Sequence, residues 1–270
     1  MYIYLILLLF YVYYMYFEKY YIKLNLYYKL LEYEKRENKK IIIIIDEEWK
    51  DKDIIIDNKL SNHIIFLNDN IKFMDVISNI KNNDNIDIDI IIHSLGGDIS
   101  SSDSIVNILL TYDGLINTYI PYYAMSAGSL IALCGNQIYM DRHSQLGPVD
   151  PQISVSLEGD SNEEYIPAKT LIDMNKEGNL NNNNLIINYY DGKLLYDDGI
   201  RTVKNILFKK YKRRAIKTIT DEFCSGKYPH SKPFNIIELE NMGLLINTNI
   251  NQKIKEISNL LIKYLDNKII

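Results

Sequence analysis

Cysteine is scarce in this 270-residue chain. Its two cysteines, Cys134 and Cys224, lie far apart and form no CxxC pair. This excludes a disulfide framework and argues against a structural zinc site. We therefore expect both to be small apolar side chains packed on helices, and we expect no metal and no cofactor.

An excess of basic charge is also missing. The formal net charge is −5 and the isoelectric point is near 5.5, so no global field favours nucleic acid, and we expect no nucleic-acid partner. The phosphate-binding pattern GxxxxGK[ST] does not occur. Any activity should therefore be independent of ATP, and energy-driven unfolding of a substrate would have to come from another protein.

Charged side chains are absent from the first 17 residues, Met1 to Phe17. A helix of that length rises about 25 Å, close to the lower limit for crossing a bilayer. We interpret it as a single-pass membrane anchor, followed by a charged linker at residues 18–40. That linker holds seven Lys and Arg against four acids, which predicts a cytoplasmic body. A cleaved signal peptide or a buried helix of the globular part are the alternatives.

The body, residues 41–270, alternates between strand-like and helix-like segments. An uninterrupted isoleucine run at Ile41–Ile45 is typical of a strand buried on both faces. Alternation of strands and helices predicts βαβ units and a mostly parallel sheet, hence an α/β fold. Further strands are expected at 63–67, 86–92, 116–120 and 137–140, with helices at 68–82, 101–110 and 126–134.

The sequence of the second half of the body predicts surface insertions and helices. The acidic stretch Leu157–Glu164 and the Asn-rich stretch Lys176–Asn184 are expected to be surface insertions. One long basic amphipathic helix is expected over Leu194–Phe223. Asn235 with Glu238 fits a capping box, and an apolar stripe between Ile250 and Leu265 predicts a last helix that packs on the body.

Two short motifs follow predicted strands. His93-Ser-Leu-Gly-Gly-Asp98 places a Gly-Gly pair where the backbone can turn sharply and present its N–H groups. Ala124-Met-Ser-Ala-Gly-Ser129 places Ser126 at the start of an apolar helix between small residues. There the N–H of Ala127 is free to stabilise an oxyanion. Because consecutive parallel strands end at one edge of a sheet, both motifs should meet there.

These motifs and their surroundings resemble the serine dehydrogenase proteinase family. The stretch Pro121–Ile153, with AMSAGS and LGPVDPQ, carries the resemblance, together with IDIDIIIHSLGGDI and IPAKTLIDM. That family is similar to signal peptide peptidase A and to the ClpP/crotonase-like superfamily. The resemblance implies a ClpP/crotonase-like fold, a homo-oligomer and a peptide or protein substrate. It implies Ser126 as nucleophile and an oxyanion hole from the Gly96-Gly97 loop and Ala127.

The base that deprotonates Ser126 is less well defined. No histidine stands at the Clp-like spacing, where Asp150 lies instead, and His143 comes too early. We interpret His230 as an exposed loop residue. A signal-peptide-peptidase-like Ser-Lys dyad is therefore expected, with Lys169 preferred to Lys176 because apolar neighbours could desolvate its amine and lower its pKa.

Other interpretations remain open at this point. An α/β-hydrolase would use Ser126 and His230 with an acid between them, but position 124 lacks the glycine of GxSxG. A crotonase-type acyl-CoA enzyme would need the paired amides and no serine nucleophile. A catalytically inactive membrane scaffold would keep the fold and the oligomer but lack the general base that activates Ser126.

Overall fold

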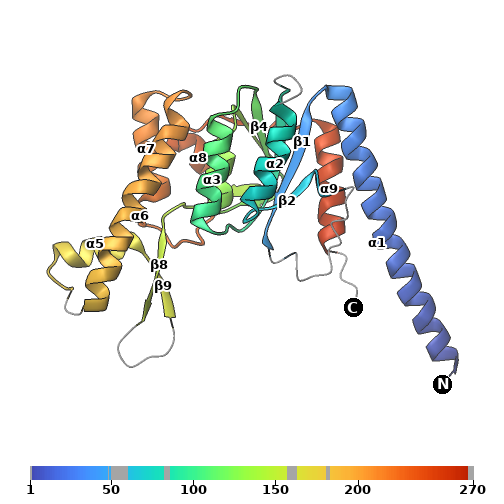
Figure 1. The fold of residues 1–270 in the computed structure, drawn as a ribbon, viewed down its shortest axis with the longest axis horizontal. Coiled ribbons are helices and arrows are strands. Elements are labelled where there is room, and N and C mark those ends of the chain that lie inside the picture. The colour runs from blue at the N-terminus through green and yellow to red at the C-terminus, as the bar shows by residue number, and fades with distance from the viewer. Residues whose placement is uncertain are drawn as a thin grey trace.

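The computed structural model describes residues 2–47, 49, 60–81, 86–156, 163–180 and 183–266. Within them, six parallel strands form a central sheet in the order β10-β6-β4-β3-β1-β2 (Figure 1). The predicted parallel α/β architecture is confirmed. The strands are β1 (Lys40–Ile45), β2 (Ile64–Phe66), β3 (Ile88–His93), β4 (Ile116–Ile120), β6 (Gln137–Met140) and β10 (Ile246–Asn247).

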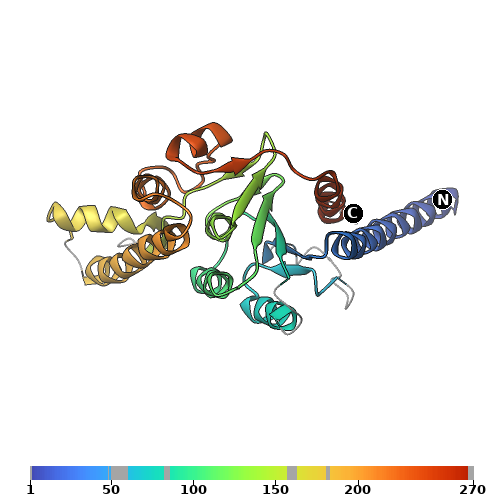
Figure 2. The same ribbon diagram turned by 90° about the horizontal axis from the view of Figure 1, so that it is seen from above.

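The isoleucine run of β1 is buried because helices cover both faces of the sheet. Ile42 and Ile44 point into one core, whereas Ile41, Ile43 and Ile45 point into the other. The first face carries α2 (Asn70–Lys81), α3 (Ile99–Leu110), α4 (Ala127–Leu133), α6 (Asn183–Phe208), α7 (Arg213–Cys224) and α8 (Ile236–Met242). The second face carries α1 (Tyr2–Glu37) and α9 (Gln252–Asp266), which lie side by side (Figure 2).

A smaller arm extends from the body (Figure 1, lower left). It consists of the antiparallel hairpin β8 (Gln152–Ser156) and β9 (Glu163–Pro167), helix α5 (Ala168–Lys176) and the first turns of α6. Ile153, Val155, Ala168 and Leu171 form its own small core. Of the predicted acidic insertion only Glu163 and Glu164 are described, as the start of β9, and residues 157–162 lie outside the described residues. The described part of the Asn-rich stretch lies at the end of α5 and the start of α6, and residues 181–182 also lie outside the described residues.

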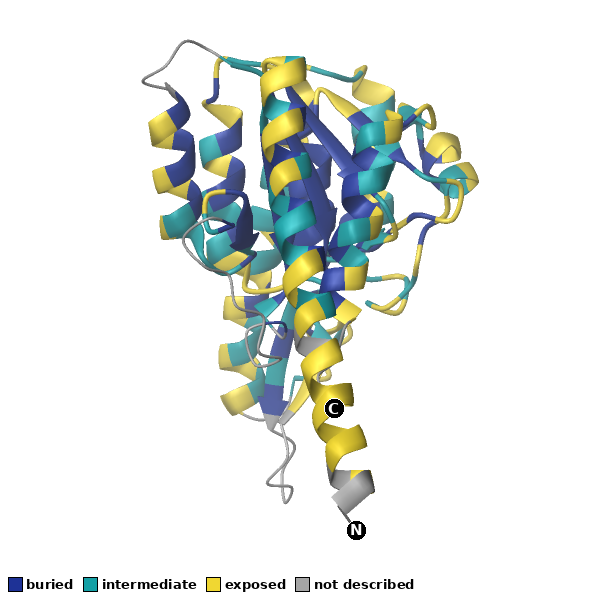
Figure 3. Ribbon diagram, turned by 90° about the vertical axis from the view of Figure 1, so that its right-hand side faces the viewer, coloured by how far each residue is buried: buried dark blue, intermediate teal, exposed yellow. Residues whose placement is uncertain are grey.

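Helix α1 joins the predicted anchor and the predicted linker into one element. Leu26, Leu30 and Tyr33 are buried against α9 and β1, so residues 18–37 are part of the folded body and not a linker. The N-terminal half projects away from the body, and its described side chains from Tyr4 to Phe17 are exposed (Figure 3). None of the described helices has the combined length and hydropathy of a membrane span, so the predicted anchor is not confirmed.

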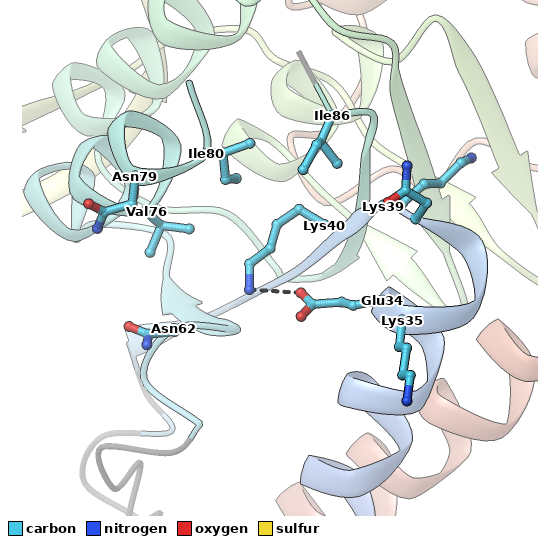
Figure 4. A pocket seen from close by; sticks show the side chains of 10 residues that line it. Glu34, Lys35, Lys39, Lys40, Asn62, Val76, Asn79, Ile80 and Ile86 are labelled. Carbon is cyan, nitrogen blue, oxygen red and sulfur yellow. Dashed lines mark ion pairs between the residues drawn. The ribbon is translucent and has the colours of Figure 1, made fainter. Parts of the chain in front are cut away.

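At its C-terminal end α1 meets β1 and α2 around a pocket of about 470 Å³. Glu34 of α1 pairs there with Lys40 at the start of β1, with Nζ and Oε1 2.7 Å apart (Figure 4). The same carboxylate oxygen lies 3.2 Å from the backbone nitrogen of Ile41. These contacts fix the connection between the helix and the first strand.

The predicted long helix over residues 194–223 is wrong, because the chain forms two helices with a break between Phe208 and Arg213. The break allows Lys210 to turn inward, where its Nζ donates to the carbonyl oxygens of Leu133 and Gly135 at the end of α4. Burial lowers the pKa of the Lys210 ammonium to about 8. The predicted capping box of Asn235 and Glu238 is confirmed at the start of α8.

Candidate active site

Ser126 lies between the short strand β5 (Tyr123–Ala124) and helix α4. Its backbone is in an unusual conformation, with φ 49° and ψ −121°, and its hydroxyl makes no capping bond to the helix. A non-glycine residue at positive φ is strained, and such strain concentrates at functional sites. The sharp turn presents Oγ to a cleft instead of using it to cap α4.

His230 lies beside this hydroxyl. Its Nε2 is 3.1 Å from Ser126 Oγ, within hydrogen-bond distance, and about a third of the side chain is exposed. The loop before α8 carries it. His230 can therefore accept the serine proton while remaining accessible to a substrate.

Asp150 completes the arrangement from the far side of the imidazole. Its Oδ1 lies 2.9 Å from His230 Nδ1, and the side chain is only 1% exposed. The other carboxylate oxygen accepts a hydrogen bond from Gln152 Nε2 at 2.8 Å. With Asp150 as acceptor, Nδ1 of His230 carries the proton and Nε2 is left as the acceptor for Ser126.

The three side chains come from segments that backbone hydrogen bonds bind together. Leu146 and Phe234 exchange two such bonds, of 3.2 and 2.7 Å, so the loop containing His230 lies against the loop containing Asp150. The buried hydroxyl of Ser129 donates to the carbonyl of Ala124 and accepts the N–H of Gly147 at 2.8 Å. Ser129 thus connects the segment that carries Ser126 to the segment that leads to Asp150.

The Gly-Gly loop lies directly against Ser126. Gly96 has φ +123°, and a Cβ there would approach Ser126 Cβ to 2.8 Å. Its N–H donates to Ser94 Oγ at 3.0 Å. By contrast, the N–H groups of Gly97 and Ala127 have no acceptor among the described residues. Of the three residues expected in the oxyanion hole, Gly97 and Ala127 have a free donor and Gly96 does not.

The two expected lysines do not lie at this cleft. Both pair with Asp173 on α5: Lys169 through a short contact, and Lys176 with Nζ 3.4 Å from Oδ1. Neither belongs to the described lining around Ser126. A general base must lie within hydrogen-bond distance of the hydroxyl that it deprotonates, and these two amines are instead paired with Asp173 on α5.

Sequence reasoning did not place His230 and Asp150 together beside Ser126. Asp150 stands in the LGPVDPQ stretch, and the chain order serine, acid, histidine is the one that an α/β-hydrolase would require. His143, the nearer histidine, is exposed and lies outside the described cleft lining. Spacing along the chain favoured the nearer candidates, although 104 residues separate Ser126 from its histidine.

The cleft has a volume of about 430 Å³ and a mixed lining. Its apolar lining includes side chains from α3, α4 and α6, and the arm contributes Tyr165. No group of three or more metal-ligating side chains occurs in the described part of the chain. Besides the three hydrogen-bonded residues, the lining includes Gly97, Ile99, Asp103, Ala127, Leu130, Val149, Leu195 and Asp198.

Comparison with protein families finds a match over residues 1–268 to the family described as ClpP-like SDH-type serine proteinase. Among curated proteins, the uncharacterized protein MJ1495 of Methanocaldococcus jannaschii is 32% identical over 64% of this chain and 56% of its own length. A second uncharacterized protein of that organism, MJ0137, is 29% identical over 62% and 56%. These matches span little more than half of the relatives.

Among solved structures, a mutant of the 1510-N membrane-bound stomatin-specific protease is similar, with TM-score 0.46 and 17% identity over 84% of each chain. Another mutant of that protease, in complex with a substrate peptide, gives TM-score 0.47 and 16% identity over 80% of each chain.

Proposed function

Because this chain belongs to the family of ClpP-like SDH-type serine proteinases, we propose that it is an ATP-independent serine endopeptidase with the catalytic triad Ser126, His230 and Asp150. The predicted class, serine peptidase, is the class of this family. The observation that carries the triad is the unbroken hydrogen-bond path from Asp150 through both ring nitrogens of His230 to Ser126 Oγ. Similar triads recur on unrelated folds and are recognised by geometry.

In the proposed reaction, His230 Nε2 takes the proton of Ser126 as Oγ attacks the carbonyl carbon of the scissile peptide bond. The protonated imidazole then gives this proton to the leaving amine. Water, deprotonated by the same histidine, hydrolyses the acyl-enzyme. Asp150 holds the imidazole in the required tautomer and stabilises its charged form.

The negative oxygen of the tetrahedral intermediate would be bound by the N–H groups of Gly97 and Ala127. Both residues line the same cleft as Ser126, and neither N–H has another acceptor among the described residues. Two donors fixed before the reaction stabilise charge that exists only in the transition state, so they raise the rate rather than substrate affinity.

A Ser-Lys dyad with Lys169 or Lys176 is the competing assignment. It would require the arm to move and Asp173 to release the lysine. The triad needs no such rearrangement, and for that reason we favour His230 as the base.

Labelling with a serine-directed phosphonate tests the proposal directly. The full-length protein should gain the mass of one phosphonyl group on Ser126, and Ser126→Ala should lose both the label and peptidase activity. A protein that folds but never reacts would instead support an inactive scaffold.

We further propose that the exposed N-terminal half of α1 attaches the protein to a membrane, with the body on the cytoplasmic side. It contains no charged residue before Glu18, and the basic residues follow it. Its exposed apolar and aromatic side chains would otherwise face water. They include Tyr4, Ile6, Leu7, Leu8, Leu9, Phe10, Tyr13, Tyr14 and Phe17.

Assembly into a homo-oligomer also stays a proposal. The arm supports it with an exposed apolar stripe on α6. Ile187, Tyr190 and Leu194 are 59%, 61% and 70% exposed and share one face at helical spacing. Such a stripe suits contact with a second copy. Analytical ultracentrifugation of Leu194→Glu against the wild-type protein tests this contact.

A further inference from the structure

The N–H of Gly97 can serve as an oxyanion donor only if the loop from Ser94 to Asp98 is held in one conformation. The loop follows the C-terminal end of β3, and Gly96 has φ +123°, a value that glycine can adopt because it lacks a Cβ. A free loop of this kind would turn its N–H groups away from the nucleophile in many of its conformations. Some part of the structure must therefore fix it.

The backbone of Ser94 is bonded to Tyr123 and Met125, and the side chain of Asp46 binds the Ser94 hydroxyl and the residue that follows. Asp46 is the residue after β1 and is 5% exposed. One carboxylate oxygen accepts a short hydrogen bond from the hydroxyl of Ser94, and the other accepts the N–H of Leu95 at 2.8 Å. Ser94 Oγ in turn accepts the N–H of Gly96 at 3.0 Å. The Asp46 carboxylate thus binds Ser94 and Leu95 directly and holds Gly96 through the hydroxyl of Ser94.

Glu47, the residue after Asp46, is connected to the other end of the loop, Asp98, through the side chain of Asn68. Glu47 accepts a hydrogen bond from Asn68 Nδ2 at 3.0 Å, and Asn68 Oδ1 accepts the N–H of Asp98 at 2.9 Å. A Cβ on Gly97 would come within 2.5 Å of that amide oxygen. The loop is therefore held on both sides of Gly97, with Asp46 on the side of the nucleophile.

We propose that Asp46 is a positioning residue for the reaction: through Ser94 and Leu95 it orients the Gly97 N–H toward the oxyanion. This rests on the proposed function, because it assigns a role within that oxyanion hole. Burying a carboxylate is costly unless its oxygens are hydrogen-bonded, and here two loop donors satisfy them. Its negative charge cannot itself stabilise an oxyanion, so its contribution is orientation.

Kinetics of Asp46→Ala and Asp46→Asn in the full-length protein test the proposal. Removing one oxyanion donor typically lowers kcat by about 10²–10³-fold, so we expect a fall in kcat of about 10²-fold for Asp46→Ala, with KM within about twofold. The affinity of a peptide boronic acid, which mimics the tetrahedral intermediate, should fall in parallel. Asp46→Asn, which keeps one acceptor and gains a donor toward Ser94, should recover part of the loss.

Two comparisons separate positioning from general stability. Ser94→Ala combined with Asp46→Ala should be little worse than Asp46→Ala alone, because both act through one chain of hydrogen bonds. The matched control is Asp89→Asn on β3, which removes charge from a fully buried aspartate bound by Tyr33 and Asn117. It should lower the melting temperature and leave kcat and boronate affinity unchanged.

Amide order parameters of Gly96 and Gly97, measured by ¹⁵N relaxation, provide a readout that needs no turnover. They should fall in Asp46→Ala and not in Asp89→Asn. Unchanged order at Gly97, unchanged kcat in Asp46→Ala, or an equal kcat loss in Asp89→Asn would overturn the positioning role. If the wild-type protein neither cleaves peptides nor reacts with phosphonate at Ser126, the proposed function fails, and the order parameters still decide whether Asp46 holds the loop.

Discussion

His230 Nε2 lies 3.1 Å from Ser126 Oγ, and the imidazole is held from behind by Asp150 at 2.9 Å. We expect His230→Ala to lower the rate of phosphonate labelling of Ser126 by at least about 10²-fold, because a serine hydroxyl without a base is a weak nucleophile. The labelling reaction is quenched at set times, and intact-protein mass spectrometry of each sample gives the rate.

The lysine variants are the controls for that experiment. Lys169→Met and Lys176→Met should label at close to the wild-type rate, since both amines pair with Asp173. If either lysine variant lost labelling while His230→Ala kept it, the dyad would replace the triad.

Asp150→Asn should leave the fold intact and slow peptide hydrolysis by about 10²–10⁴-fold. An amide that donates toward Nδ1 favours the wrong imidazole tautomer, with the proton on Nε2 facing Ser126. Steady-state kinetics at fixed pH measure the loss. Gln152→Leu removes the other hydrogen bond to this carboxylate and should cost far less. Equal effects of the two variants would argue against a special role for Asp150.

Gly96→Ala should abolish activity. The new Cβ would meet Ser126 Cβ at 2.8 Å, and the φ of +123° disfavours any side chain. Gly178→Ala is the matched control: its φ is +73°, but nothing lies within 4 Å of the added Cβ. Both variants should lose roughly 1 kcal/mol through backbone strain. Only Gly96→Ala should lose peptidase activity, and full activity in that variant would show that the loop does not approach the nucleophile.

Because His93 is buried, we expect the unfolding free energy of the protein to fall in acid. Burial lowers the pKa of the His93 imidazole from 6.5 to about 4. Between these two pH values the imidazole is protonated in the unfolded chain and neutral in the folded one. Stability is therefore fully present above about pH 6.5 and is lost as the pH falls toward 4. Between about pH 7 and pH 5 the wild-type protein should lose about 2 kcal/mol of unfolding free energy from this group.

Urea unfolding of His93→Phe at both pH values checks this, with the exposed His143→Gln as control. The first variant should show a smaller acid loss than the wild-type protein and the second an equal one. An acid loss in His93→Phe as large as that of the wild-type protein would assign the effect to other groups.

Removal of residues 1–17 should abolish flotation with phospholipid vesicles and leave peptidase activity unchanged, because the deleted part of α1 projects from the body. Removal of residues 1–40 should instead unfold the protein. That deletion takes away the buried Leu26, Leu30 and Tyr33. Vesicle binding by the shorter deletion would place the membrane contact elsewhere.

Local sequence was sufficient to predict the parallel sheet and the start of an apolar helix at Ser126. The isoleucine runs, the Gly-Gly turn and the small residues around Ser126 act over a few neighbouring positions, and periodicity and turn chemistry report such effects directly. The capping box at Asn235 is predictable for the same reason: donor and acceptor are three residues apart.

Tertiary structure decided which side chain lies beside Ser126 and where the helices end. His230 meets Ser126 where the bridge between Leu146 and Phe234 joins two distant loops, and Asp173, one turn away, pairs with Lys169. The break before Arg213 brings Lys210 to the end of α4, and α9 packs on the buried side chains of α1. Several bases and several helix boundaries were compatible with the local sequence. Long-range packing and hydrogen bonds decide among them, and residue spacing along the chain does not reveal these contacts.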